Sequence, residues 1–244
     1  MKKERLELLI TTIILALVIV LEELKIFSTI NNFFLSQINL KNSLIIRITT
    51  DTASLEAFIA YMAILYFGFA IKRKSIPKNV ISFIIAIIIS MIATLFIKAF
   101  TMVPRPYEIQ PHWSIITSII NADYFSFPSG HTVRVSVLAY YITYVFDSTK
   151  KSKLKYLSWI YALIIMYTRL ALQVHYFSDL LAGIIVALWS SLLIINLENV
   201  WVKIYNKLFY KIKILNCLFY SSGNPLSIIS FKSAVKYEVL TPMK

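Results

Sequence analysis

Three short polar segments interrupt an otherwise apolar chain, and their residue types are those of a phosphate site. The segments are Lys98 to Arg105-Pro106, then Pro128-Ser129-Gly130-His131, and then Arg169 with His175 and Asp179. Each lies where a hydrophobic stretch begins or ends. Ionisable groups at the ends of membrane segments are costly to keep, so they indicate a function. Two histidines, fixed cations and a carboxylate predict an integral membrane enzyme that transfers or removes phosphate.

The first polar segment supplies two cations of different geometry. Arg105 stands between Pro104 and Pro106, and prolines on both sides end a helix and hold the backbone extended. An arginine fork can bind two phosphate oxygens, whereas Lys98 at the end of the preceding apolar stretch offers a point charge. The segment predicts two phosphate ligands, although a snorkelling Lys98 and an interfacial Arg105 would give the same pattern.

The second polar segment has the pattern of a helix start that binds an anion. Pro128 ends the preceding loop, Ser129 suits the N-cap, and Gly130 lets a ligand approach the backbone. Free amides in the first turn attract phosphate. His131 would lie beside the bound phosphate, which keeps the imidazole protonated for general acid catalysis. A capped helix with an incidental histidine is the alternative.

The third polar segment pairs a histidine with a carboxylate. His175 and Asp179 are four residues apart, which makes them neighbours on one helical face if the last apolar stretch begins its helix early. A carboxylate on one imidazole nitrogen fixes the tautomer and leaves the other nitrogen free to attack phosphorus. Arg169 must reach the same phosphate from the turn or from the end of the preceding helix. A zinc site of His131, His175 and Asp179 is the alternative, but three nearby cations would oppose a dication.

Arg134 follows His131 by three residues and lies one turn deeper in an apolar stretch. One role for Arg134 is a buried ion pair with an acid such as Glu56. The other is contact with a second phosphate, which would suit a diphosphate substrate.

The composition predicts one helical membrane domain. The 244 residues are 58% hydrophobic and the mean hydropathy is +0.72, which is too apolar for a soluble globule. The net charge of +13 lies in short runs between apolar stretches rather than along one face, which argues against nucleic acid as a partner. Cys217 is the only cysteine, so an intramolecular disulfide is excluded.

Six continuous apolar stretches predict an all-α, integral membrane six-helix bundle, because a barrel would show alternating hydrophobicity. The stretches are residues 6–21, 53–71, 80–97, 132–146, 156–167 and 180–197. We expect the first to be an uncleaved transmembrane helix, since no small-residue cleavage site follows it. Residues 1–199 would form the membrane domain, and residues 200–244 a basic interfacial helix and a cytoplasmic tail.

The loop charges predict the orientation of the bundle. Lysines and arginines concentrate at residues 2–5, 72–78 and 150–155 and in the tail, and the side with this excess is cytoplasmic. Both termini of this multi-pass cell-membrane protein would then be cytoplasmic, and the three polar segments would meet at the outer, extracytoplasmic end. We expect the mixed segment 27–50 to lie along that outer interface.

The order and spacing of the polar residues resemble those of the type 2 phosphatidic acid phosphatase superfamily. These membrane lipid phosphatases share their motif with vanadium haloperoxidases. The matching residues are Lys98, Arg105, Pro106, Pro128, Ser129, Gly130, His131, Arg169, His175 and Asp179. Thr168 departs from the usual serine but keeps a hydroxyl. The motifs span residues 98–179, and the six-helix layout extends the resemblance to about residue 197.

The resemblance implies a role for each residue. His175 would be the nucleophile that forms a phosphohistidine, Asp179 would orient it, and His131 would protonate the leaving oxygen. The phosphate ligands would be Lys98, Arg105, Ser129, Gly130 and Arg169. No metal ion and no cofactor would be required. This agrees with the chemistry of the residues, because phosphoryl transfer needs mainly positioning and neutralisation of the phosphate oxygens.

A site at the outer membrane surface predicts a lipid phosphate as substrate. Polyprenyl diphosphate (undecaprenyl or dolichyl), hydrolysed to the monophosphate, suits this placement and Arg134. Phosphatidic acid and phosphatidylglycerol phosphate are the alternatives, as is transfer of the phosphate to another lipid. A transporter of anions or lipids is the alternative of another class, but it would place polar residues across the bilayer rather than at one end.

Overall fold

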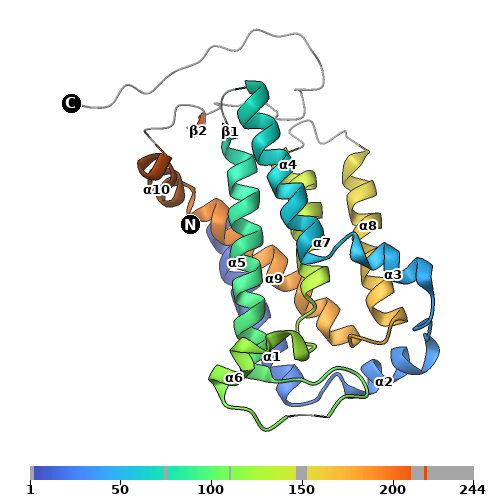
Figure 1. Cartoon of the computed structure of the whole chain (residues 1–244). Coiled ribbons are helices and arrows are strands. Elements are labelled where there is room, and N and C mark those ends of the chain that lie inside the picture. Colours follow the sequence, from blue (N-terminus) through green and yellow to red (C-terminus); the bar gives the residue numbers. More distant parts are fainter. Residues whose placement is uncertain (1–2, 74–75, 110, 147–152, 210–216, 219–244) are drawn as a thin grey trace.

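The computed structural model describes residues 3–73, 76–109, 111–146, 153–209 and 217–218, and helices dominate it (Figure 1). The elements are α1 (Lys3–Glu23), α2 (Ser28–Gln37), α3 (Leu44–Asp51), α4 (Leu55–Arg73), β1 (Ile76–Pro77), α5 (Lys78–Thr101), α6 (Ile115–Ile120), the 3-10 helix η1 (Ala122–Tyr124), α7 (Gly130–Tyr140), the π-helix η2 (Tyr141–Phe146), α8 (Leu154–Ala171), α9 (Phe177–Asn196), α10 (Glu198–Phe209) and β2 (Cys217–Leu218). The two short strands pair in parallel, with Ile76 opposite Cys217.

Each predicted apolar stretch corresponds to a helix, so the prediction of a mostly helical membrane fold is confirmed. The corresponding helices are α1, α4, α5, α7 with η2, α8 and α9. Among the described residues, three helices, α4, α5 and α9, are long and apolar enough to cross a membrane. Of the others, α7 has only 11 residues, α1 carries acidic residues near both ends, and α8 includes Lys155 and Arg169. Six membrane crossings therefore stay a prediction.

Helix α9 is the centre of the bundle, with α1, α5 and α7 packed against it (Figure 1). Its buried face is rich in small side chains, which let neighbouring helices approach closely. These small residues are Ser178, Ala182, Gly183, Ala187, Ser190 and Ser191. At Gly183 an added Cβ would lie 2.9 Å from the Thr132 Cβ and 3.1 Å from the Ser129 carbonyl oxygen. Glycine at this position therefore sets the distance between α9 and the start of α7.

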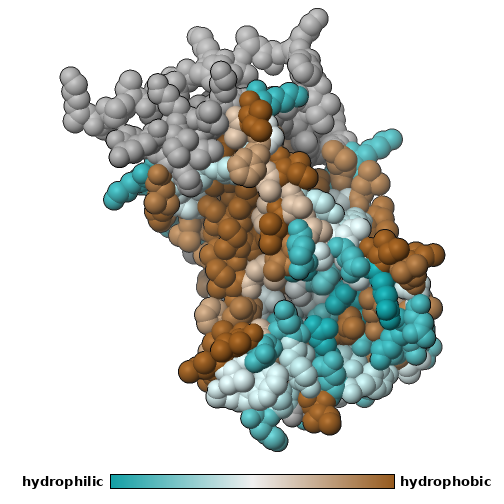
Figure 2. All heavy atoms as spheres, in the orientation of Figure 1, coloured by the Kyte–Doolittle hydropathy of each residue, from teal (hydrophilic) through white to brown (hydrophobic). Residues whose placement is uncertain are grey.

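The outside of the bundle is apolar along much of its length. Helix α5 buries Ile87 and Ser90 but exposes Ile88, Ile92 and Phe96 on another face. Figure 2 shows hydrophobic residues gathered along α5 and hydrophilic residues gathered toward α2 and α3. Apolar surface of this extent is unfavourable in water and suits contact with a lipid bilayer.

The two ends of the bundle differ in what they carry. Helices α2 and α6 lie at one end with the loops of the three polar segments, whereas α10 and the β1–β2 pair lie at the other (Figure 1). The start of α1 lies beside the end of α9, because Asn196 Nδ2 donates to the Glu4 carbonyl oxygen over 3.1 Å. The segment expected along the outer interface forms α2 and α3, which contact α9 and α8. The membrane side that each end faces stays a prediction.

The basic helix predicted after the membrane domain is present as α10, and it begins at Glu198 rather than at residue 200. Lys203 and Lys207 are exposed on it, while the buried Trp201 donates from Nε1 to the Ile194 carbonyl oxygen over 2.9 Å. The rest of the predicted helix, residues 210–215 with Lys211, lies outside the described residues. So do the tail after residue 218 and the predicted cytoplasmic loop charges at Lys74, Lys150 and Lys151.

Candidate active site

The start of α9 brings His175 and Asp179 together, but not on one helical face. The predicted contact is present, but the helix begins at Phe177 with Tyr176 as its N-cap, so it does not start early enough to include His175. The Asp179 side chain instead folds back over the helix start. Its Oδ2 accepts the Tyr176 amide over 2.8 Å and lies 3.0 Å from His175 Nδ1. A carboxylate at the third helical position suits this capping contact.

This contact determines which nitrogen of His175 is available. An ionised carboxylate can only accept, so Nδ1 carries the proton and Nε2 keeps its lone pair. The imidazole is buried, with 2% of its surface exposed. Burial first, and then the charges of Arg169, Lys98 and Arg105, hold the pKa of His175 well below its ordinary value. A neutral imidazole with a free Nε2 is suited to nucleophilic attack.

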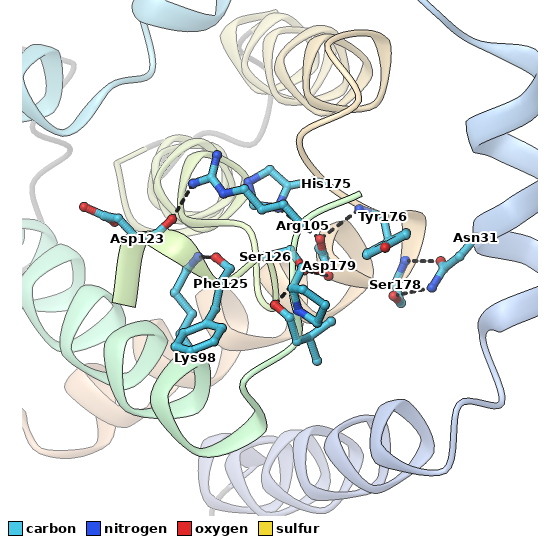
Figure 3. Close-up of polar contacts among 12 residues, drawn as sticks. Asn31, Lys98, Arg105, Asp123, Phe125, Ser126, His175, Tyr176, Ser178 and Asp179 are labelled. Carbon is cyan, nitrogen blue, oxygen red and sulfur yellow. Dashed lines mark hydrogen bonds and ion pairs between the residues drawn. The ribbon is translucent and has the colours of Figure 1, made fainter. Parts of the chain in front are cut away.

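The first polar segment is held by backbone carbonyls of the η1 region (Figure 3). Lys98 lies in the last turn of α5, as predicted, and its Nζ donates to the Phe125 carbonyl oxygen. Arg105 follows Pro104, which forms a bridge with Phe125, and its Nη2 donates to the Asp123 carbonyl oxygen over 2.6 Å. Backbone carbonyls therefore fix both cations, and neither cation forms an ion pair with an acidic side chain within the described part of the chain.

Arg169 reaches the site from the last turn of α8, as predicted. It is buried, and its Nη1 donates to Thr50 Oγ1 over 3.0 Å. Its Nε is buried without a hydrogen-bond partner among the described residues, and the same holds for Arg105 Nε. Buried cationic donors without acceptors are unfavourable unless a ligand supplies the acceptor.

The second polar segment forms the start of α7, with Ser129 as N-cap and His131 in the first turn. The expected side-chain cap is not made, because the Ser129 Oγ is buried without a hydrogen-bond partner in the described structure. The Ser129 backbone amide donates to the Asp179 carbonyl oxygen over 3.1 Å. An added Cβ at Gly130 would meet Arg134 Nη1 and Met91 Cε at 3.5 Å, which are ordinary contacts. Packing within the protein therefore does not demand glycine at position 130.

Arg134 does not form the expected pair with Glu56 within the described residues. Its Nε and Nη2 both donate to the Ala53 carbonyl oxygen, over 3.0 and 2.8 Å, and its Nη1 lies 3.6 Å from Met91 Sδ. A carbonyl at the start of α4 therefore takes the place of the acid. Because Nη1 lies near Gly130, one end of this guanidinium still faces the α7 start.

Three residues of the site were not identified from the sequence. Ser126 Oγ lies 3.5 Å from Asp179 Oδ1, Thr50 accepts from Arg169, and Asn31 pairs with Ser178 beside Asp179. Ser126 could have been noticed because it lies two residues before Pro128. Asn31 and Thr50 lie far away in the sequence, in a segment without a motif.

The described residues contain no group of three or more His, Cys, Asp or Glu side chains that could hold a metal ion. The alternative zinc site of His131, His175 and Asp179 is therefore not assembled in this structure.

A family model described as the PAP2 superfamily matches residues 79–203, about half of the chain. The chain therefore belongs to the PAP2 superfamily, and the resemblance seen in the sequence is confirmed. No curated protein matches the sequence.

Two solved structures are similar to this one. The first is described as the first transmembrane PAP2-type phosphatidylglycerolphosphate phosphatase from Bacillus subtilis; it is 19% identical, has a TM-score of 0.58, and the match covers 82% of this chain and 97% of that chain. The second is LpxE from Aquifex aeolicus, at 20% identity and a TM-score of 0.49, with 71% of this chain and 94% of that chain covered. The fold is that of a transmembrane PAP2-type phosphatase, and the protein is a membrane protein.

Proposed function

We propose that the protein is a lipid phosphatase that works through a phosphohistidine at His175 without a metal ion. The observation that carries the proposal is the buried His175 imidazole, with Nδ1 on Asp179, near cations whose Nε donors have no partner among the described residues. Phosphate oxygens would accept hydrogen bonds from Arg105 Nε, Arg169 Nε and Ser129 Oγ.

The proposed reaction has two steps, phosphorylation of His175 and hydrolysis of the phosphohistidine, and His131 transfers the proton in both. First, His175 Nε2 bonds to phosphorus while the bond from phosphorus to the leaving oxygen breaks, and His131 gives that oxygen its proton. Then His131 takes a proton from water, the water oxygen bonds to phosphorus, and the P–N bond breaks. Inorganic phosphate leaves, and the lone pair returns to Nε2. Asp179 stabilises the positive charge on the imidazole between the two steps.

The phosphate ligands we propose are Lys98, Arg105, Ser129, Gly130 and Arg169. Fixed cations and first-turn amides of α7 would neutralise the equatorial oxygens in the transition state. Lys98 lies in the last turn of α5 and Arg169 in the last turn of α8. Cations gathered at helix ends rather than across the bundle support an enzyme with its site at one end rather than an anion or lipid transporter.

We place the site at the outer face of the membrane, with six crossings and both termini cytoplasmic. Lys78, Lys203 and Lys207 lie at the α10 end of the bundle, and an excess of such residues is typical of the cytoplasmic side. Residues 200–244, which comprise most of α10 and the tail, would form a basic interfacial helix and a cytoplasmic tail on that side.

The substrate we favour is a polyprenyl diphosphate, cleaved to the monophosphate. Phosphatidic acid is one competing lipid, and phosphatidylglycerol phosphate, the substrate named for the Bacillus subtilis protein, is the other. Arg134 would contact the second phosphate through Nη1, since its other donors are engaged by Ala53. Arg134→Ala should therefore lower diphosphate hydrolysis more than monophosphate hydrolysis, and equal losses on both would remove this role.

Inorganic phosphate release by detergent-purified protein tests the function. We would compare undecaprenyl diphosphate, phosphatidic acid and phosphatidylglycerol phosphate in EDTA, with His175→Ala as the inactive control. Release that survives EDTA and falls by at least roughly 10⁴-fold in the variant is expected. No release, together with labelled phosphate appearing on an added acceptor lipid, would instead identify a phosphotransferase.

A further inference from the structure

Helix α2 contacts the candidate site through a single buried polar side chain, Asn31. Asn31 is 6% exposed, whereas its neighbour Asn32 is exposed. Two reciprocal hydrogen bonds join Asn31 to Ser178: Asn31 Nδ2 donates to Ser178 Oγ over 2.9 Å, and the Ser178 amide donates to Asn31 Oδ1 over 3.0 Å. Figure 3 shows Asp179 between this pair on one side and Lys98 and Arg105 on the other.

Ser178 is the second residue of α9, so its amide has no acceptor within the helix. Asn31 supplies that acceptor from a position 147 residues away in the chain. The adjacent Asp179 carboxylate accepts the Tyr176 amide and the proton of His175 Nδ1. Without Asn31, the buried Ser178 amide would lack its acceptor directly beside the carboxylate that orients His175.

Further contacts align α2 with the loop that carries His175. The Phe34 ring stacks on Phe177, with ring centres 4.6 Å apart and planes at 11°. Gln173 Nε2 donates to the carbonyl oxygens of Leu35 and Ile38, over 3.0 and 3.2 Å. The C-terminal part of α2 therefore contacts residues on both sides of His175. These contacts hold Asn31 in a fixed position relative to the start of α9.

We propose that Asn31 is a positioning residue: it fixes the start of α9 so that Asp179 holds His175 with Nε2 directed at the phosphate. The family match begins at residue 79, so this contribution comes from outside the matched part of the chain. The proposal rests on the phosphohistidine mechanism proposed above. It predicts that Asn31 acts on the rate at which His175 is phosphorylated and not on the binding of the lipid.

The test is the rate of phosphohistidine formation in a single turnover, with enzyme in excess over a terminally ³²P-labelled lipid. The lipid is undecaprenyl diphosphate or phosphatidic acid, whichever the wild type hydrolyses faster. We expect Asn31→Ala to form phosphohistidine roughly 10- to 100-fold more slowly, with KM changed less than about twofold. Asn32→Ala, an exposed asparagine on the same helix, should match the wild type.

Two milder variants keep the test decisive if Asn31→Ala does not fold. Asn31→Asp keeps an acceptor for the Ser178 amide and should recover most of the rate, while Ser178→Ala keeps the amide contact and should lose less than Asn31→Ala. An unchanged phosphorylation rate per folded molecule in Asn31→Ala would overturn the positioning role, as would a loss confined to the amount of folded protein. If the wild type forms no phosphohistidine at all, the proposed mechanism fails instead.

Discussion

The two sides of the candidate site differ in how completely their polar groups are hydrogen-bonded. On the His175 side, the Asp179 carboxylate accepts from His175 and Tyr176, and Asn31 accepts the Ser178 amide. On the α7 side, the N-cap Ser129 leaves its hydroxyl buried without a partner among the described residues. We call the first side closed, because the protein's own donors hold the Asp179 carboxylate, and the second side open, because it keeps a buried donor available.

The difference between the two sides matches the different needs of the nucleophile and of the phosphate ligands in the proposed reaction. A nucleophile must be held in one tautomer and one orientation before the substrate arrives, so its partners belong to the protein. A phosphate ligand must exchange partners when the substrate binds, so its donors are kept available. Substitutions on the closed side should therefore lower kcat, and those on the open side should weaken phosphate contacts while leaving the fold intact.

After His175→Ala, the substitution expected to lower activity most is Asp179→Asn. The amide keeps the shape of the side chain but loses the negative charge that stabilises the His175 imidazolium and fixes its tautomer. We expect kcat for phosphate release to fall roughly 10³-fold with little change in KM. A fall in kcat of less than about tenfold would contradict the proposed role of the closed side, because its contacts would then not be needed for the chemistry.

Gly183→Ala tests whether the two sides must be held at a fixed distance. The new Cβ would come within 2.9 Å of Thr132 and 3.1 Å of the Ser129 carbonyl oxygen, so α7 must shift relative to α9. We expect a stability loss of about 1–3 kcal/mol and a fall in kcat of roughly tenfold or more. Gly68→Ala is the matched control, because nothing lies within 4 Å of its new Cβ; thermal unfolding and phosphate release are measured for both.

Ser129→Ala isolates the open side. The hydroxyl makes no capping bond, so its removal should change the unfolding temperature very little. Loss of one phosphate contact should nevertheless lower kcat/KM by roughly tenfold. A marked loss of stability with normal activity would show that the hydroxyl serves the helix start rather than the phosphate.

The smallest expected effect is a pH dependence of stability. Burial and nearby cations lower the pKa of His175 well below 6.5 in the folded protein, so the unfolded chain takes up this proton first as the pH falls. Stability is therefore full above pH 6.5 and declines below it, by up to about 1.4 kcal/mol per pH unit. The unfolding temperature should fall more between pH 7.5 and pH 5.5 in the wild type than in His175→Asn. An equal fall in the two proteins would contradict a buried neutral imidazole.

Much of the fold could be predicted because it depends on local patterns. Continuous apolar stretches located α1, α4, α5, α7, α8 and α9, and the turn residues Pro104, Pro106 and Pro128 marked where polar segments interrupt them. The family resemblance likewise depended on the types and spacing of ten residues. These features are read along the chain, so they needed no knowledge of which helices touch.

The chemical types of the candidate site residues and their order along the chain follow from the sequence alone: Lys98, Arg105, His131, Arg169, His175 and Asp179. The roles proposed for them rest on these types and on the family resemblance. Their hydrogen-bond partners follow only from how the helices pack. Arg134 binds the Ala53 carbonyl instead of Glu56, and Asn31 caps α9 from another helix. Contacts between segments far apart in the chain depend on helix packing, and backbone carbonyls and amides, which every residue carries, leave no signature in the sequence.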